Sequence, residues 1–251
     1  MSIELTFPEP FLCVVTIDNM EKRNALGTKE FRGLASAWET LSVRQDIRCL
    51  VLTGQGQQAF CSGAQLDSDF SELGDVDDWI DRALLKTRFF PIPLVAAVNG
   101  HCVAGGLELM IACDIRIASE KAMIGLPEVR WGIVPTGGAA MKLVDQIGYA
   151  QAMQLLLTGE LISAEKALQL GLINQVCSGA DVLNRAMAVA RQIASNSPNA
   201  VRHTKRLALA KRFEKWGDQE VGERLAALDA RSGTDVKKGI SAFLNKTTPI
   251  Y

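Results

Sequence analysis

Glu108 is a charged residue inside an apolar segment, Leu107–Cys113. It follows the pair Gly105–Gly106, which we expect to open a helix whose first N–H groups lack partners and favour negative charge. A carboxylate in a first helical turn is often only a cap. Burying it among leucines is costly without a use, so the pattern predicts an acid/base carboxylate beside an anion or oxyanion site.

A second candidate carboxylate, Glu128, lies in the glycine-containing segment Ala122–Gly138. Pro127 restricts the backbone before it, and the glycines indicate an irregular, closely packed stretch. Taken alone, Glu128 is typical of a surface loop acid. Its role depends on the residues that the fold places beside it.

Both glutamates need elements that position them, and the first half of the chain alternates strand and helix patterns. Runs rich in β-branched residues predict strands, and apolar residues at helical spacing predict helices between them. Glycine-containing turns at 60–66 and 99–109 follow two of these strands, where open α/β sheets bind ligands. The expected strands are Leu12–Ile17, Arg48–Thr53, Pro93–Val98 and Asp114–Ala118, and the expected helices are Thr28–Leu41, Asp77–Phe90 and one after Gly105–Gly106.

From about Asp181 no strand pattern remains. We therefore divide the chain into an α/β core with the active site, 1–180, and a C-terminal helical region for oligomerisation, 181–251. Expected helices in that region are Val182–Ala194, Ala200–Arg212, Asp218–Arg231 and Asp235–Asn245. The acidic stretch 67–81 is interpreted as a solvated loop running into a helix start, since a metal loop would carry tighter ligand spacing.

Composition excludes several classes of partner. Lys and Arg total 27 against 28 Asp and Glu, spread along the chain, so nucleic acid is not an expected partner. The six cysteines lack metal-ligand spacing, so we expect reduced thiols and no metal site. The N-terminus has no targeting pattern, and no apolar run reaches the roughly 18 residues needed to span a membrane. We expect a cytoplasmic protein with no membrane partner.

Other enzyme classes fit the motifs poorly. The segment Gly54–Ala59 imitates a dinucleotide-binding turn, but the residues after it do not open a helix. The glycines after Gly100 lack the Lys-Ser/Thr of a phosphate-binding loop, and there is no GxSxG with a usable histidine. Neither an oxidoreductase nor a serine hydrolase is therefore expected.

A series of short segments forms a pattern that extends over essentially the whole chain. In chain order they are Lys22–Leu26, Ala59–Ala64, Val98–Glu108, Ala112–Ala118, Leu126–Glu128, Gly132–Pro135, Leu157–Gly159 and Ile162–Ala167, the last running into Gly171–Ile173. Any one segment is weak, but their order and spacing are specific. In them the chain resembles the crotonase, or enoyl-CoA hydratase/isomerase, superfamily.

The resemblance implies an α/β fold, a spiral of β-β-α units with a C-terminal helical trimerisation region. It also implies an acyl-CoA thioester substrate, a homotrimer or a homohexamer made of two trimers, and no separate cofactor, since coenzyme A enters with the substrate. By position, the N–H groups of Ala64 and Gly105 would form the oxyanion hole that stabilises the thioester enolate.

The same resemblance implies residues that hold the substrate. Gln65 stands where members commonly have Asp, and Trp131, which replaces a small aliphatic residue, could narrow the acyl pocket or simply pack. Lys246 could reach a coenzyme A phosphate on a neighbouring subunit, or could be a solvated helix-end lysine. The full expected set is Lys22, Ala25, Leu26, Gln65, Leu66, Asp67, Trp131 and Lys246.

Within this superfamily, hydratases carry acids at both glutamate positions, and many isomerases keep only the later one. Glu108 and Glu128 together therefore imply reversible hydration of an enoyl-CoA to a 3-hydroxyacyl-CoA, a hydro-lyase reaction. By resemblance, Glu108 deprotonates the water and Glu128 protonates C2. An enoyl-CoA isomerase, a carnitinyl-CoA-type dehydratase and a non-catalytic scaffold stay open as alternatives, and the acyl chain is not specified.

Overall fold

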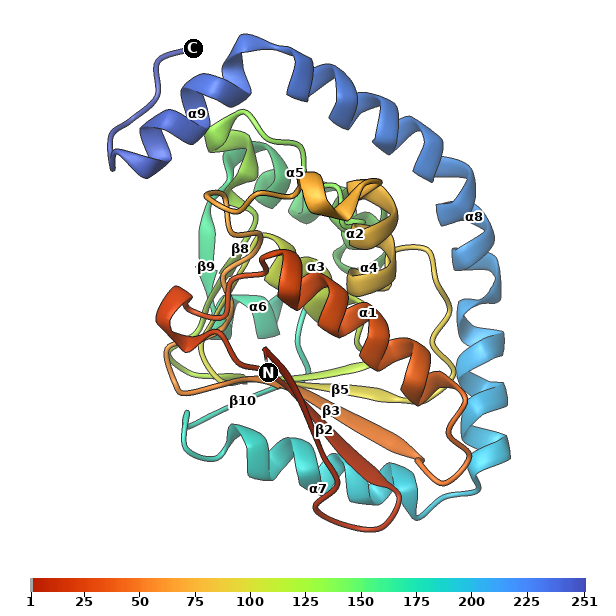
Figure 1. Ribbon diagram of the computed structural model, residues 1–251. Helices are drawn as coiled ribbons and strands as arrows, with labels where there is room; N and C mark the ends of the chain where they lie inside the picture. Colours follow the sequence, from red (N-terminus) through yellow and green to blue (C-terminus); the bar gives the residue numbers. More distant parts are fainter. Residues whose placement is uncertain (1) are drawn as a thin grey trace.

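Two sheets form the centre of the molecule, within the residues 2–251 that the computed structural model describes, the side chains of Glu72 and Asp218 excepted (Figure 1). The larger sheet is parallel except for its antiparallel edge strand β1. Its strands, in spatial order, are β1 Ile3–Thr6, β2 Leu12–Ile17, β3 Cys49–Gly54, β5 Leu94–Val98, β7 Ile115–Ser119 and β10 Gln175–Cys177. The smaller sheet contains β4 Ala59–Cys61, β6 His101–Val103, β8 Met123–Gly125 and β9 Leu161–Ser163.

The two sheets arise from one repeated step along the chain. Strands β3, β5 and β7 enter the larger sheet in parallel, and each is followed by a short strand, β4, β6 or β8, that enters the smaller one. A helix follows each pair: α2 Val76–Leu84, α3 Gly105–Ile111, and the 3-10 helix η3 Pro127–Trp131. This is the expected spiral of β-β-α units, so the predicted α/β crotonase fold is confirmed.

Helices cover both faces of the larger sheet because its strands are apolar on both sides. The helix α1 Thr28–Ser42 packs on one face in the main core, together with α2 and α3. On the other face, α7 Val182–Ala194 contributes Val182, Ala186 and Ala190 to a second apolar cluster with β3, β5 and β7 (Figure 1). The remaining elements are η1 Met20–Lys22, η2 Ser71–Leu73, α4 Ala139–Ile147, α5 Tyr149–Thr158 and α6 Ala164–Gln169.

The C-terminal region forms a long arm around the core. One helix, α8 Pro198–Ser232, replaces the two helices expected there, and α9 Thr234–Leu244 follows it (Figure 1). Pro198 begins α8 behind the capping side chain of Ser197, and Gly217, which lies between the two expected helices, is accommodated within the helix. The arm ends against η3, because the backbone of Trp131 lies directly over Gly239 of α9.

The acidic stretch is not simply solvated, in contrast to the expectation. Asp75 pairs with Arg224 at 2.8 Å, and Asp77 pairs with Arg231 at 2.8 Å, so the start of α2 is tied to the second half of α8. The partners are about 150 residues away in sequence, which is why local composition did not indicate them. The helix α2 is also shorter than expected, because Leu85 adopts a left-handed conformation and ends it.

No disulfide joins the six cysteines, and five of them are buried. Among the helices of residues 2–251, none combines the length and the apolar composition that crossing a membrane requires. No group of three or more His, Cys, Asp or Glu side chains in the described part of the chain is arranged to hold a metal ion.

Candidate active site

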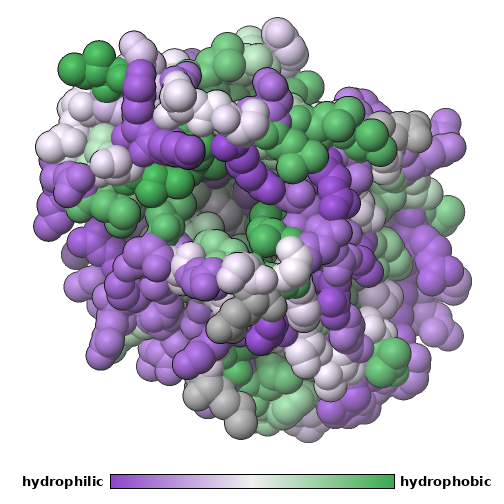
Figure 2. All heavy atoms as spheres, turned by 45° about the horizontal axis from the view of Figure 1, so that its top comes forward, coloured by the Kyte–Doolittle hydropathy of each residue, from purple (hydrophilic) through white to green (hydrophobic). Residues whose placement is uncertain are grey.

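A cavity of about 180 Å³ lies where the smaller sheet, α3, η3 and the C-terminal arm meet, and both candidate glutamates line it. It also contains Ala64 and Gly105, whose amides were the expected oxyanion donors. The rest of its wall is mostly apolar. Figure 2 turns this end of the fold forward, and apolar side chains gather around a hollow bordered by hydrophilic groups.

The carboxyl group of Glu108 is held in one orientation. It lies in the first turn of α3 and is 4% exposed. Its Oε1 accepts hydrogen bonds from the N–H groups of Gly137, at 2.7 Å, and Ala139, at 3.1 Å. Ala139 begins α4, so Glu108 caps that helix from another part of the chain, where the helix dipole favours negative charge.

Glycine at position 137 leaves room for the carboxyl group of Glu108. A Cβ there would lie 2.4 Å from Oε2 of Glu108, well inside contact distance. The missing side chain is what allows the carboxylate to approach the backbone of the 137–139 turn.

Glu128 is buried in a different environment. Pro127 begins η3 and directs Glu128 into the cavity, where the side chain is 8% exposed. Its Oε2 is buried and has no hydrogen-bond partner among the described residues. An unpaired, buried carboxyl oxygen favours the neutral, protonated acid.

The two environments affect the carboxyl pKa values differently. The pKa of Glu108 is raised above its ordinary value. Burial and the negative charge of Glu223 raise this pKa by more than the two amide hydrogen bonds and the charge of Lys142 lower it. Burial also raises the pKa of Glu128, and the charge of Glu108 raises it further. Because the amide donors and the lysine act on Glu108 rather than Glu128, ionisation of the pair is favoured at Glu108.

Two backbone amides face the same cavity without a partner. Neither the N–H of Ala64 nor that of Gly105 donates a hydrogen bond within the described residues. They lie close together: a Cβ on Gly105 would be 3.8 Å from the amide nitrogen of Ala64. Gly63, with φ of +90°, makes the turn possible, because a Cβ there would lie 2.6 Å from Cβ of Ala104.

Most of the expected coenzyme A residues surround one backbone contact. Leu26 and Ala64 form an isolated parallel bridge, in which Gln65 donates its N–H to the Leu26 carbonyl at 3.0 Å. Near this bridge in the chain, Lys22 pairs with Asp67 at 3.2 Å, and about half of each side chain is exposed. Ala25 is buried beside Leu26, and Leu66 lines the cavity.

The remaining two expected residues come from the other side of the site. Trp131 lines the cavity and packs edge to face on Phe243 of α9, with ring centroids 5.1 Å apart. Lys246 follows α9 in a left-handed conformation and is exposed. It donates its N–H to the carbonyl of Phe243, but the structure does not bring its side chain into the cavity.

Sequence reasoning missed several residues of the cavity wall. Phe31, Ile80, Leu84 and Phe243 supply much of its apolar surface. Ile80 and Leu84 are four residues apart on α2, so their helical spacing marked an apolar face without indicating what it faces. No local signal connects Phe243 with a cavity more than one hundred residues earlier in the chain.

Comparison with known proteins identifies the family. Residues 9–251 match the family model described as enoyl-CoA hydratase/isomerase. An enoyl-CoA hydratase of Mycobacterium tuberculosis is 37% identical, covering 95% of this chain and 92% of the relative. A short-chain-enoyl-CoA hydratase of Clostridium acetobutylicum is 31% identical, covering 94% and 92%. A solved carnitinyl-CoA dehydratase of Mycobacterium avium superposes with a TM-score of 0.92 at 32% identity, covering 100% and 98%. The chain belongs to the enoyl-CoA hydratase/isomerase family of the crotonase superfamily, whose members act on acyl-CoA thioesters.

Proposed function

We propose that this protein reversibly adds water to the C2–C3 double bond of an enoyl-CoA thioester and forms the 3-hydroxyacyl-CoA. The observation that supports this proposal is the pairing of unlike carboxyl environments in one cavity. Two N–H donors favour the ionised form of Glu108, whereas Glu128 is buried with an unpartnered oxygen. Hydration requires both a base and an acid, and this pair supplies one of each.

In the proposed reaction, Glu108 accepts a proton from the water while the water oxygen bonds to C3. The electron pair of the double bond moves toward the thioester carbonyl, and the enolate oxygen accepts hydrogen bonds from the N–H groups of Ala64 and Gly105. Glu128 then donates its proton to C2. Glu108 gains one proton and Glu128 loses one, so the two carboxyl groups together hold one proton both before and after the reaction. Dehydration reverses these transfers.

The substrate proposal follows from the two sides of the site. Lys22, Gln65 and Asp67 offer polar groups at the surface beside the Ala64 amide, where the coenzyme A portion would lie. Ile80, Leu84, Trp131 and Phe243 offer an apolar wall for the acyl chain. A cavity of about 180 Å³ is small, which supports a short acyl chain.

The decisive experiment is a panel of enoyl-CoA thioesters of different chain length, followed by loss of the enoyl absorbance. We expect Glu108→Gln and Glu128→Gln each to lower turnover by at least about a hundredfold, the scale of one acid/base role. Glu120→Gln, at an exposed site on the same chain, is the matched control and should retain full turnover.

Near-normal hydration in both cavity variants would contradict the mechanism. If Glu108→Gln were silent while double-bond migration persisted, the activity would be that of an isomerase. The proposal also includes a cytoplasmic location, which the reduced cysteines support.

A further inference from the structure

Lys142 is a buried cation that the proposed chemistry does not use directly. It lies in the second turn of α4, is 1% exposed, and forms no ion pair within the described part of the chain. Its ammonium donates to the carbonyl of Leu85 at 2.8 Å and lies 5.4 Å from the ring centre of Trp216. Burial lowers the pKa of Lys142 to about 8, opposed first by the charge of Glu108. A buried ammonium without a counter-ion is costly, which points to a function for it.

The position of Lys142 lies directly behind the turn that holds Glu108. A Cβ on Gly138 would lie 3.4 Å from Cε of Lys142, so the lysine chain packs against the residue between the two amide donors, Gly137 and Ala139. At the far end of the side chain, the ammonium fixes Leu85, the residue that follows α2. The residue before it, Leu84, packs against Gly137 and lines the active-site cavity. Lys142 therefore joins the donors for Glu108 to the cavity wall.

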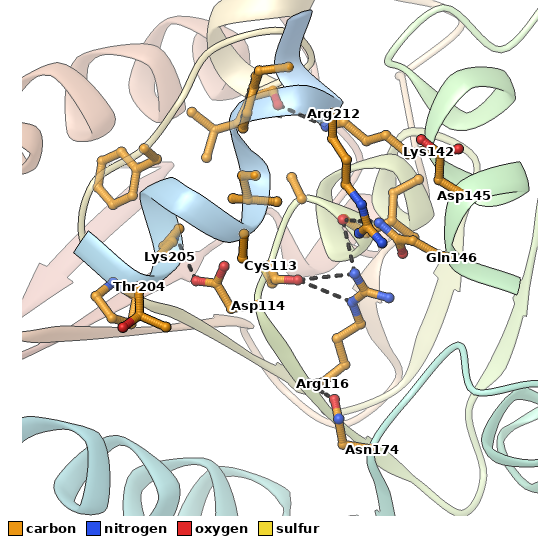
Figure 3. A pocket seen from close by; sticks show the side chains of 18 of the residues that line it. Cys113, Asp114, Arg116, Lys142, Asp145, Gln146, Asn174, Thr204, Lys205 and Arg212 are labelled. Carbon is orange, nitrogen blue, oxygen red and sulfur yellow. Dashed lines mark hydrogen bonds and ion pairs between the residues drawn. The ribbon is translucent and has the colours of Figure 1, made fainter. Parts of the chain in front are cut away.

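On its other side, Lys142 borders a separate cavity of about 660 Å³ between α8 and the core. Figure 3 shows Lys142 running from α4 along this cavity, with Arg116 and Arg212 nearby. Arg116 donates to the carbonyls of Ile111, Cys113 and Leu172, which are neutral. Asp114 and Asp145 also line this cavity, but they pair with Lys205 at 2.7 Å and Lys215 at 2.9 Å, while the charge of Asp81 favours the charged form of Lys142. Since no carboxylate of the described residues forms an ion pair with Lys142, its field reaches Glu108 through a medium of low dielectric constant.

Other charged groups also face Glu108. The charge of Glu223, from α8, raises the pKa of Glu108, and the charge of Glu108 raises the pKa of Glu128, which comes from η3. Glu223 is partly balanced by Lys86, at 2.9 Å. Lys142 is the opposing positive charge that acts on Glu108 most directly.

We propose that Lys142 is a positioning residue for the hydration reaction: it supports the 137–139 turn and supplies the positive charge that keeps Glu108 ionised beside an uncharged Glu128. It does not line the active-site cavity, so it acts through Glu108 and not on the substrate. This inference rests on the proposed function and adds to it the residue that separates the protonation of the two glutamates.

The test removes the charge of Lys142 and keeps a side chain of similar size. In Lys142→Met, the Glu108 carboxyl should hold its proton to higher pH, by at least about one pH unit, because a neighbouring charge shifts a carboxyl pKa by one to three units. The acid limb of the pH profile of kcat should move to higher pH by the same amount, with KM nearly unchanged. Lys142→Arg should restore the wild-type limb. Lys215→Met, which removes a half-exposed lysine of α8, is the control and should not move it.

Two measurements keep the inference separate from the proposed function. Infrared titration of the carboxyl C=O band, assigned to Glu108 with Glu108→Gln, follows protonation in the full chain without substrate. Lys142→Gln is made alongside, and circular dichroism identifies the folded variants.

The inference would be overturned if Glu108 titrated at the wild-type pH in folded Lys142→Met or Lys142→Gln. It would also be overturned if the Glu108 titration shifted in Lys142→Arg by as much as in Lys142→Met. If the protein hydrates no enoyl-CoA in the panel, the proposed function fails, and the infrared titration still decides the role of Lys142.

Discussion

The protonation of a buried active-site glutamate links catalysis to stability at the scale of a single residue. The pKa of Glu128 is raised above its ordinary value of 4.5, mainly by burial. An unfolded chain loses this proton near pH 4.5, whereas the folded chain keeps it to higher pH. The folded state is therefore favoured at low pH, and that contribution is lost as the pH rises through the folded-state value.

Replacing Glu128 by a neutral amide should remove this loss. We expect Glu128→Gln to raise Tm at pH 8 by roughly 2–4 °C, the shift that about 1 kcal/mol produces in a chain of this size, and to change it little at pH 5. Thermal unfolding at the two pH values measures the effect. The exposed Glu120→Gln should leave Tm unchanged at both. An equal Tm gain at pH 5 and pH 8 would show that ionisation of Glu128 is not the cause.

Single residues differ in how far sequence alone predicts them. Glu108 is conspicuous because its neighbours in the chain are apolar. Glu128 resembles a surface acid until η3 turns it into the cavity, and only the family resemblance connects it with Glu108. Lys142 gives no local signal, because its importance depends on Leu85, 57 residues earlier, and on a glutamate from another helix. Partners distant in sequence are what the pattern of one segment cannot show.

At the scale of the elements, a buried ion pair connects α2 to the C-terminal arm. Lys86 follows α2, Glu223 lies in α8, and their side chains are 3% and 6% exposed. Glu220 approaches the same lysine at 3.6 Å. The pair fixes the segment that carries the Leu84 wall of the cavity against α8.

Breaking this pair from the lysine side should be strongly destabilising. We expect Lys86→Met to cost about 3–5 kcal/mol in urea unfolding, because Glu223 is left as a buried charge without its cation. Adding Glu223→Leu to that variant should recover most of the loss. Arg44→Met, which breaks the exposed pair with Asp46, should cost no more than about 1 kcal/mol. Loss of stability in the double variant as large as in Lys86→Met would rule out the unpaired charge as the cause.

Longer helices and strands were predicted from the sequence more accurately than short ones. The four central strands of the larger sheet, β2, β3, β5 and β7, and the helix α7 were predicted within one residue, because five or more apolar or periodic residues give a clear pattern. The shorter outer strands β1 and β10 were not predicted. The three-residue strands β4, β6 and β8 have too few residues to show alternation, and the turns around them were recognised only by their glycines. These short strands are nevertheless what place Ala64 and Gly105 side by side.

At the scale of the whole molecule, the repeated β-β-α step explains why the site lies where it does. Each short strand of the smaller sheet ends near the cavity, so consecutive units deliver the Ala64 turn, the start of α3 and then η3 to one place. The arm of α8 and α9 then brings Phe243 and Glu223 to the same region. The site is thus completed by residues from both ends of the chain, which is why no single segment of the sequence contains it.

The same arm leaves an apolar stripe uncovered. Val221, Leu225 and Leu228 follow one another at helical spacing on α8 and are 62%, 63% and 50% exposed, while Arg224 and Arg231 pair with α2. An exposed apolar stripe of this kind is typical of a subunit contact. It supports the expected assembly as a homotrimer or homohexamer, for which the C-terminal region was expected to be responsible.

We expect the native mass from light scattering to be three or six times the 27.2 kDa of the chain. Charges in the stripe, as in Val221→Asp with Leu225→Asp, should shift the protein toward the monomer, because two carboxylates cannot be buried in an apolar contact without partners. Val43→Asp, at an equally exposed apolar residue after α1, should keep the assembly intact. A wild-type chain that is monomeric, or a stripe variant that keeps the wild-type mass, would remove this surface from the assembly. Circular dichroism must match wild type, so that dissociation is not mistaken for unfolding.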